Sequence, residues 1–406
     1  MSIITTIRGG VCAPKGFSAS GIHCGIRKNK TKKDLALIVS ESRAAAAAVY
    51  TQNLVKGAPI LVTKSHIADG YAQAIVCNSG NANTCNANGV EVAQEMCALA
   101  AAATGVAAED VLVASTGVIG QPLDITPIAA AMPALAAALG DNSADAADAI
   151  MTTDLVAKEI AVCFTINGTE CKMGGIAKGS GMIHPNMATM LVFITTDAAI
   201  PPALLQKALS EDVRDTFNMI SIDGDTSTND TVALLANGKA ENPPVEEGTE
   251  AYVTFQEALK TVTTYLCREI AKDGEGATKL LTCKVTGAAD AKTAKSAAKS
   301  VICSSLVKTA MFGADANWGR VLCALGYSGA DLDVSKIDVA FASAAGTLTV
   351  CKNGAGTPFS EELAREVLTQ GEVEILVELH SGDTTATAWG CDLTYDYVKI
   401  NGDYRT

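Results

Sequence analysis

Apolar positions along the chain follow two patterns, one typical of buried strands and the other of helices. Residues 74–80 and 111–115 are almost continuously apolar, and each run passes into a turn that contains glycine, which predicts a buried strand. Residues 91–104 and 127–140 are rich in alanine and predict helices, the second of them short and buried. Because strands and helices alternate, we expect sheets covered by layers of helices.

A hairpin, a loop and a further strand are predicted in the middle of the chain. Residues 159–168 and 169–179 form the arms of the hairpin, because Asn167-Gly168 is a strong signal for a two-residue turn. Glycine, serine, proline and asparagine then dominate up to residue 186, whereas residues 190–197 have the composition of a strand. The chain therefore passes from loop to buried strand at Ala188-Thr189.

The rest of the chain predicts further helices and strands joined by loops. The expected helices are at residues 202–217 and 255–274, and the expected strands are at residues 231–238, 373–380 and 385–393. Neither a tandem repeat nor a low-complexity linker separates these elements. We therefore expect the two halves to pack closely together, and not to form two domains joined by a flexible linker.

Composition and charge narrow the classes of function. The chain has 406 residues, of which 48% are hydrophobic and 18% charged, so it can bury a large core and is far from a disordered composition. Its formal net charge of −13 argues against nucleic acid as a partner. One basic cluster, at residues 27–33, predicts a solvated loop, with a site for an anionic ligand as the alternative.

Cysteine and histidine usage gives little support to a disulfide framework or a metal centre. The 13 cysteines are scattered without a CxxC pair, and there are only four histidines. The first residues lack the apolar core of a signal peptide, and no apolar stretch is long and clean enough to span a bilayer. We therefore expect reduced thiols in a cytoplasmic protein, with no metal and no membrane partner.

Thr189 is the candidate nucleophile. A threonine hydroxyl must lose its proton to a base, and the free α-amine of an N-terminal threonine can serve, since its pKa is about 7.7–8.0. An internal threonine has no such amine, so the backbone must first be cut between Ala188 and Thr189. The small Ala188 gives access to the preceding carbonyl, and Gly179, Gly181 and Pro185 supply bends. These features alone favour the simpler interpretation, in which Thr189 is a β-branched residue that opens a strand.

A family resemblance changes that balance. The segment GGIAKGSGMIHPNMATMLVFITTDA resembles the ornithine acetyltransferase (glutamate N-acetyltransferase) family of arginine biosynthesis, whose precursors cut themselves before the threonine of an A-T-M-L segment. Further blocks resemble the same family between residues 10 and 406: GVCAPKGFSASGIHCGIR, VCNSGNANTCNANG, ASTGVIG, MTTD, SIDGDTSTND, DGEGATK, ADANWGR and INGDYRT.

The resemblance implies a catalytic set. It identifies Thr189 as the nucleophile, freed by cleavage after Ala188. It identifies Thr116 and Gly117 as the oxyanion hole, where a hydroxyl and a backbone N–H face the oxygen that becomes negative. Without the resemblance, residues 115–120 predict an ordinary turn at the end of a strand.

The resemblance also implies substrate contacts for an N-acetylated amino acid, at Thr152, Lys178, Thr189, Glu275, Asn401 and Thr406. Lys178 can pair with a carboxylate and Glu275 with an ammonium group. Whether Thr152 or its neighbour Thr153 faces the ligand stays open. Thr406 is the last residue, so its role needs an ordered terminus.

Departures from the family pattern are confined to positions outside this set. Cysteine occupies positions such as Cys77 and Cys85, where small or apolar residues are expected. His184 lies five residues before Thr189 and is either a general base or a residue that shapes the loop.

The fold expected from the resemblance is α/β (α+β), a layered α-β-β-α sandwich in two lobes, with helices covering mixed sheets. Cleavage gives an α chain, residues 1–188, with the oxyanion hole, and a β chain, residues 189–406, that begins with the nucleophile. Two copies of each chain are expected to form a heterotetramer.

The expected reaction moves acetyl from N2-acetyl-L-ornithine to L-glutamate through an acetyl-Thr189 intermediate, without a cofactor. The sequence leaves open whether acetyl-CoA is also a donor. Two alternatives remain: a self-cleaving aminopeptidase or amidase in which water replaces glutamate, and a binding protein that never cuts.

Overall fold

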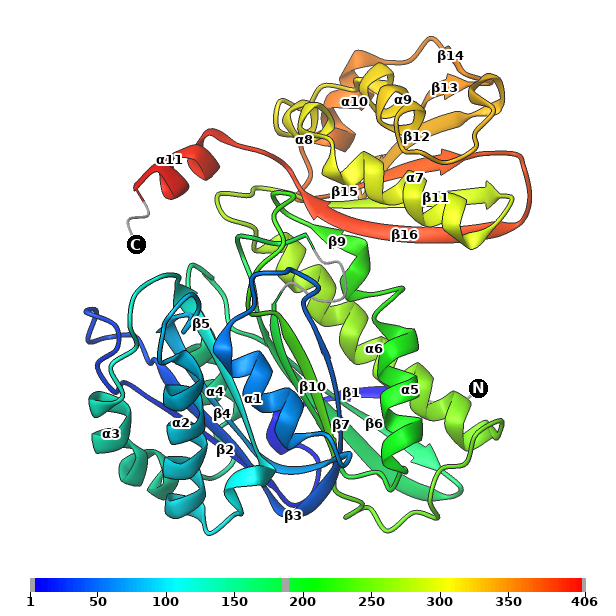
Figure 1. Cartoon of the computed structure of the whole chain (residues 1–406). Helices are drawn as coiled ribbons and strands as arrows, with labels where there is room; N and C mark the ends of the chain where they lie inside the picture. Colours follow the sequence, from blue (N-terminus) through cyan, green and yellow to red (C-terminus); the bar gives the residue numbers. More distant parts are fainter. Residues whose placement is uncertain (1–3, 185–189, 404–406) are drawn as a thin grey trace.

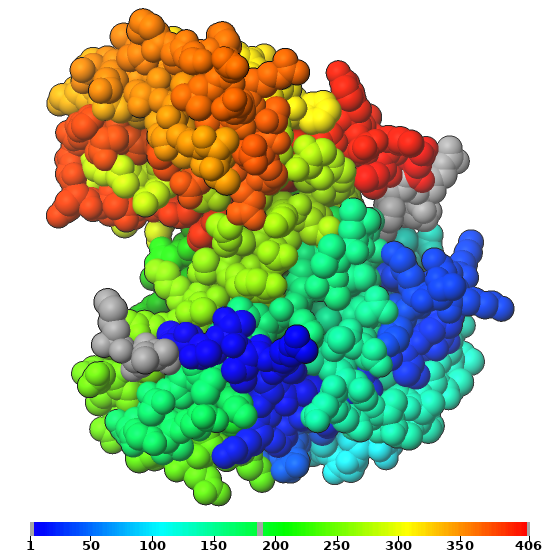
Figure 2. All heavy atoms as spheres, turned by 180° about the vertical axis from the view of Figure 1, so that it is seen from behind, coloured from blue at the N-terminus to red at the C-terminus, as the bar shows by residue number. Residues whose placement is uncertain are grey.

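The computed structural model describes residues 4–184 and 190–403, which form two lobes (Figure 1). A nine-stranded sheet is the framework of the larger lobe, and a seven-stranded sheet is the framework of the smaller lobe. Figure 2 shows the smaller lobe, yellow to red, against the larger lobe, which is mostly blue to green. The two mixed sheets and their covering helices confirm the predicted fold class.

The sheet of the larger lobe has the order β1-β6-β7-β8-β10-β3-β4-β5, and β2 pairs with β3. Only the pairs β8–β10 and β4–β5 are parallel. The strands are β1 (Thr5–Ile7), β2 (Phe17–Ile22), β3 (Leu35–Tyr50), β4 (Tyr71–Asn81), β5 (Val111–Val118), β6 (Lys158–Ile166), β7 (Thr169–Lys178), β8 (Leu191–Thr196) and β10 (Thr231–Ala236).

The long strand β3 belongs to both halves of this sheet. Its first part pairs with β2 and β4, whereas its last six residues pair with β10. Between the halves lies one core cluster, in which buried side chains of β3, β4 and β5 meet those of β7, β8 and β10 and of helix α4 (Ser143–Ile150). The sheet therefore supplies both inner layers of a sandwich.

Helices cover the two outer faces. On one side α1 (Ala58–His66), α2 (Gly89–Thr104) and α3 (Thr126–Ala137) bury their apolar positions against the β3–β4–β5 half. On the other side α5 (Pro202–Asp212) and α6 (Glu250–Lys272) pack on the half that contains β6, β7, β8 and β10. The resulting order of layers is α-β-β-α, as predicted.

The smaller lobe packs its helices on a sheet of order β14-β13-β12-β15-β11-β16-β9. Its strands are β9 (Ile220–Ser221), β11 (Leu280–Ala288), β12 (Asp338–Ser343), β13 (Gly346–Lys352), β14 (Ala355–Gly356), β15 (Glu372–Glu378) and β16 (Thr384–Cys391). Its helices are α7 (Ala291–Cys303), α8 (Ser305–Phe312), α9 (Trp318–Gly326) and α10 (Glu361–Leu368). The last helix, α11 (Tyr395–Asp403), projects from this lobe and has no buried residue (Figure 1).

Local sequence signals explain several of these elements. The predicted hairpin is β6–β7, and Asn167 (φ 49°) and Gly168 (φ 83°) have the positive φ angles that a tight two-residue turn requires. The basic cluster is a solvated loop, as predicted, since residues 28–32 are exposed. The buried Asp34 carboxylate anchors this loop by accepting the backbone N–H groups of Cys24, Gly25 and Arg27.

The prediction for residues 127–140 needs a correction. They form α3, but only one face of this helix is buried, through Ile128, Met132 and Leu135. The helix is less buried than predicted because it is rich in alanine. Alanine raises the mean hydropathy of a segment, but its small side chain also tolerates exposure to solvent. None of the helices in residues 4–184 and 190–403 is long and apolar enough to cross a membrane.

The boundary between the lobes does not coincide with Ala188-Thr189. Strand β8, the first element after that bond, lies between β7 and β10 in the middle of the larger sheet. Chain segments on both sides of the bond therefore share one hydrogen-bonded sheet.

A glycine on β7 shows how tightly the layers meet. A Cβ atom on Gly174 would overlap the carbonyl oxygen of Gly10, the first residue of the short 3-10 helix η1 (Gly10–Cys12), and this backbone cannot swing away as a side chain could. We expect Gly174→Ala to lower the free energy of unfolding by about 3 kcal/mol. Urea denaturation measures this, with Gly371→Ala as the control, because a Cβ there meets nothing within 4 Å. Equal stability of the two variants would contradict the prediction.

Candidate active site

A cleft of about 660 Å³ gathers the predicted site residues that the structure describes. They lie on separate segments of the chain: the ends of β5 and β7, the loop before β6, the loop after α6, and α11. The predicted residues that line the cleft are Thr116, Gly117, Thr152, Lys178, Glu275 and Asn401. Thr153 lines it as well, so both neighbouring threonines face the same space.

Three predicted residues, Ala188, Thr189 and Thr406, lie outside the described residues. The described neighbour of Thr189 is Met190, which lines a small cavity together with Thr116 and Lys178. The Met190 carbonyl accepts a hydrogen bond of 2.9 Å from the backbone N–H of Thr231 at the start of β10. The residue that follows Thr189 is therefore held beside the predicted oxyanion residues.

The end of β5 has a backbone shape that only glycine permits. Gly117 has φ +131°, and a Cβ on it would overlap the Gly80 backbone of the neighbouring strand β4. The parallel β4–β5 ladder shifts register at Gly80/Asn81, directly beside Gly117. Such irregularities re-aim backbone groups at the rim of a sheet. The strand thus ends with Thr116 and Gly117 lining the cleft.

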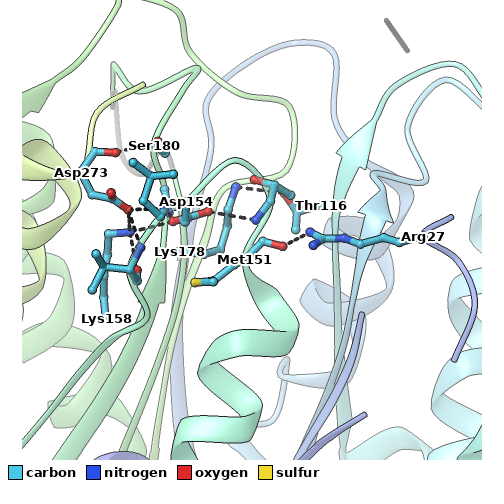
Figure 3. A network of polar contacts seen from close by, with 12 residues as sticks. Arg27, Thr116, Met151, Asp154, Lys158, Lys178, Ser180 and Asp273 are labelled. Atoms are coloured by element: carbon cyan, nitrogen blue, oxygen red, sulfur yellow. Dashed lines mark hydrogen bonds and ion pairs between the residues drawn. The ribbon is translucent and has the colours of Figure 1, made fainter. Parts of the chain in front are cut away.

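Lys178 ends β7 and lies almost fully buried beside the same strand end. Its ammonium donates to Thr116 Oγ1 over 3.3 Å. Figure 3 shows this contact and, on its other side, a chain of charged groups through Asp154, Lys158 and Asp273. Burial lowers the pKa of Lys178 overall, and the carboxylates of Asp154 and Asp230 offset only part of this effect.

Asp154 is the centre of this charged group. Its carboxylate accepts hydrogen bonds from Lys158 Nζ (2.8 Å) and from the backbone N–H groups of Gly179 (2.7 Å) and Thr152 (2.9 Å). Burial alone would raise the pKa of Asp154, but the charges of Lys178 and Lys158 and these hydrogen bonds lower it overall. A single buried carboxylate thus fixes the backbone of two segments, at Thr152 and at Gly179 directly after Lys178.

The opposite wall of the cleft carries the predicted ammonium partner. Glu275 Oε2 accepts a hydrogen bond of 2.7 Å from Asn401 Nδ2, which brings α11 to the cleft. Its carboxylate lies so close over Gly181 that a Cβ there would overlap it. The Glu275 backbone N–H also donates to the Ser180 carbonyl over 2.8 Å. Glu275 is therefore held against the loop that leads toward Thr189.

That loop is tied to the segment after β9. Asp223 accepts the backbone N–H groups of Met182 (2.6 Å) and Ile183 (2.9 Å), and Met182 has the unusual φ of +56°. The ring of His184 lies 3.1 Å from Ser221 Oγ and 3.6 Å from Cys303 Sγ, and His184 is not among the residues that line the cleft. Burial and the charge of Lys299 lower the pKa of His184. Its contacts agree with the interpretation that it shapes the loop.

Sequence reasoning missed Met182 and Asn229, which line the cleft, and the buried Asp154, which bonds to the backbone of Thr152 at its wall. Asp154 and Asn229 lie inside the quoted segments MTTD and SIDGDTSTND, so the signal was present, but their roles depend on partners far along the chain. All 13 cysteines are free thiols. The described parts of the chain contain no group of histidine, cysteine and acidic residues that could hold a metal ion.

Comparisons with known proteins cover nearly the whole chain. A family model described as the ArgJ family matches residues 18–406. The arginine biosynthesis bifunctional protein ArgJ of Caldanaerobacter subterraneus subsp. tengcongensis is 52% identical over 395 residues, which are 97% of this chain and 98% of that protein. The protein of the same name from Bacillus subtilis is 46% identical over 405 residues, 99% and 98% of the two chains.

A solved structure is also similar. The crystal structure of arginine biosynthesis bifunctional protein argJ from Bacillus halodurans shares 48% sequence identity, with a TM-score of 0.50. The match covers 98% of that chain but only 52% of this one.

The buried carboxylate of Asp154 gives a test of this charged group. Asp154→Asn leaves Lys158 and Lys178 without their shared counter-charge, so we expect it to lower the free energy of unfolding at pH 7 by about 3 kcal/mol. Because the pKa of Asp154 is lowered in the folded state, its stabilising effect is fully present above pH about 4 and declines as the pH falls further.

Urea denaturation at several pH values measures this difference. The control is Asp145→Asn, which removes a half-exposed carboxylate paired with Lys33 and is expected to cost less than about 1 kcal/mol. A cost at Asp154 no larger than at Asp145 would show that the buried group is not a structural centre.

Proposed function

The chain belongs to the ArgJ family, and we propose on this basis that it transfers acetyl from N2-acetyl-L-ornithine to L-glutamate in arginine biosynthesis, through Thr189. One observation carries the proposal. The described residues expected to form the oxyanion hole and to bind substrate line a single cleft, beside Met190, the residue that follows Thr189.

The nucleophile is made by a cut between Ala188 and Thr189, which divides the chain into residues 1–188 and 189–406. Two observations support a cut. Met190 is anchored to β10, so a new terminus at Thr189 is tethered at the cleft. The Bacillus halodurans chain is covered almost entirely while matching only half of this one, as a separated half of a cleaved precursor would be.

The reaction proceeds in two acyl-transfer steps. The α-amine of Thr189 takes the proton of its own hydroxyl, and the oxygen attacks the acetyl carbonyl of the donor. The proton then passes to the departing nitrogen, ornithine leaves, and an acetyl ester remains on Thr189. The amine of glutamate attacks this ester and loses its proton to the Thr189 amine, which returns it to the hydroxyl oxygen as N-acetyl-glutamate leaves.

Thr116 and Gly117 stabilise the tetrahedral oxyanion of both steps. Lys178 donates to Thr116 Oγ1, so the hydrogen of the Thr116 hydroxyl is available to the oxyanion, next to the N–H of Gly117. Preorganised donors of this kind are each worth about 3 kcal/mol of barrier.

The ends of the substrate are recognised by charge. The Glu275 carboxylate binds an ammonium group and the Lys178 ammonium binds a carboxylate, with Thr152, Asn401 and Thr406 completing the site. Ornithine and glutamate share the amino-acid end, so one pocket serves both in turn. The enzyme uses no cofactor; acetyl-CoA is a second donor, in keeping with the name bifunctional that its relatives carry. We assign it to the cytoplasm, as a heterotetramer of two α and two β chains.

The cut and the covalent step are tested by Thr189 variants. Thr189→Ala is expected to run as one band on a denaturing gel and to have no transferase activity, because it has no hydroxyl. Thr189→Ser keeps a hydroxyl and is expected to cut, more slowly. Wild-type enzyme incubated with N2-acetyl-ornithine alone should carry one acetyl group on the peptide that begins at residue 189, as read by mass spectrometry. An uncut Thr189→Ala protein with normal turnover would falsify the nucleophile assignment.

The acceptor separates a transferase from an aminopeptidase or amidase on the same scaffold. Ornithine release from N2-acetyl-ornithine is expected to stop after about one turnover per site without glutamate and to continue with it, because the ester waits for an amine. Full-rate release without glutamate identifies a hydrolase. Replacing the donor by acetyl-CoA in the same assay tests the second donor, and formation of N-acetyl-glutamate is the expected result.

A further inference from the structure

Asn229, in the loop before β10, uses its whole hydrogen-bonding capacity on the protein. Its Nδ2 donates to the carbonyl oxygens of Ala82 (2.6 Å) and Ser115 (3.0 Å). Its Oδ1 accepts from the hydroxyls of Thr84 and Thr228, each over 2.6 Å. An amide has two donor hydrogens and two acceptor lone pairs, so all four are engaged. Asn229 lines the cleft but has no capacity left for a substrate.

Three of these partners belong to the oxyanion side of the cleft. Ser115 is the residue directly before Thr116, and Ala82 and Thr84 follow β4, whose end lies against Gly117. The β4–β5 ladder shifts register at this point, and the backbone N–H of Ala82 donates to the Val118 carbonyl just beyond it. Asn229 bridges the Ala82 and Ser115 carbonyls from outside the ladder and holds the strand ends at a set separation.

The backbone that follows Asn229 contacts the segment directly after Thr189. Two residues later, Thr231 donates its N–H to the Met190 carbonyl, and Thr231 pairs in parallel with Leu191 at the start of β8. Only one residue, Asp230, therefore separates Asn229, which bonds to Ser115, from Thr231, which bonds to Met190. On the proposed cut, Asn229 lies in the second chain and all its partners but Thr228 lie in the first.

We propose that Asn229 is the positioning residue that sets the oxyanion donors Thr116 and Gly117 relative to Thr189. The inference rests on the proposed function. Asn229 acts through Ser115 and Ala82 and makes no contact with the reacting atoms. Its side chain has little freedom to shift, because all four of its hydrogen-bonding positions are engaged and a Cβ on Gly57 would come within 2.5 Å of its Nδ2.

The test compares two buried asparagines of the same lobe. Asn242 is buried to a similar degree, and its side chain bonds to the backbone of Ala199 and Pro243, remote from the cleft. Asn229→Ala is expected to lower kcat by about 100-fold per cut chain, as the loss of an oxyanion donor does, with KM changed less than about threefold. Asn242→Ala is expected to lower thermal stability but to leave kcat within about twofold of wild type.

Two milder variants, both at Thr84, test the inference if the Asn229→Ala protein does not cleave itself. Thr84→Val removes one hydroxyl that Asn229 Oδ1 accepts, and we expect kcat to fall about tenfold. Thr84→Ser keeps the hydroxyl and should restore kcat to near the wild-type value, which a mere packing role of the Thr84 methyl would not predict.

The outcomes separate this inference from the proposed function. A wild-type protein that neither cuts nor forms acetyl-Thr189 overturns the function itself. A working wild type together with unchanged kcat in Asn229→Ala, or in Thr84→Val where Asn229→Ala stays uncut, overturns the positioning role alone. A fall in kcat for Asn242→Ala as large as that for Asn229→Ala does the same, because the effect would then follow stability.

Discussion

The hydrogen-bonded position of β8 between β7 and β10 is the constraint on which the rest of the structure depends. Ladders on both edges of this strand fix its backbone, and Met190 directly before it is bonded to Thr231. A break in the chain just before β8 would remove no rung of either ladder. The larger lobe can therefore keep its shape when one peptide bond in the middle of the sequence is cut, which a boundary between separate domains would not guarantee.

Two buried polar groups hold the rim of the cleft around that strand, and each works by a different kind of force. Asp154 is ionic: it lies between Lys158 and Lys178 and also fixes the backbone of Gly179. Asn229 is neutral, and its Nδ2 donates to the carbonyls of Ala82 and Ser115 and so joins the ends of two strands. A negative charge at the Asn229 position would face two carbonyl oxygens. An amide at the Asp154 position would remove a negative charge that Lys158 and Lys178 share, and it would leave Asp273 as the carboxylate paired with Lys158.

Sequence patterns predicted much of the fold because the signals are local. The Asn167-Gly168 turn, the strands at Val111 and Leu191 and the helix that ends at Lys272 each follow from a few consecutive residues. The folding of one sheet into two layers depends instead on β3, whose register against β4 shifts between the pairs Val39–Ala74 and Ala44–Ala72. No local pattern encodes such a pairing, so the layering entered the prediction only through the family resemblance.

The same distinction applies to the site. Thr116, Lys178 and Glu275 were named through the family resemblance, and the structure gathers them in one cleft, yet their individual roles stay predictions. Asn229 was missed because asparagine in a loop is ordinary, and its importance appears only with partners up to 147 residues away. Hydrogen bonds such as those of Asn229 fix the relative positions of groups that come from distant segments. Catalysis needs this, because a strand end that is held only by its own ladder can still move relative to the other catalytic groups. The residues that position the chemistry are then harder to find in a sequence than the residues that perform it.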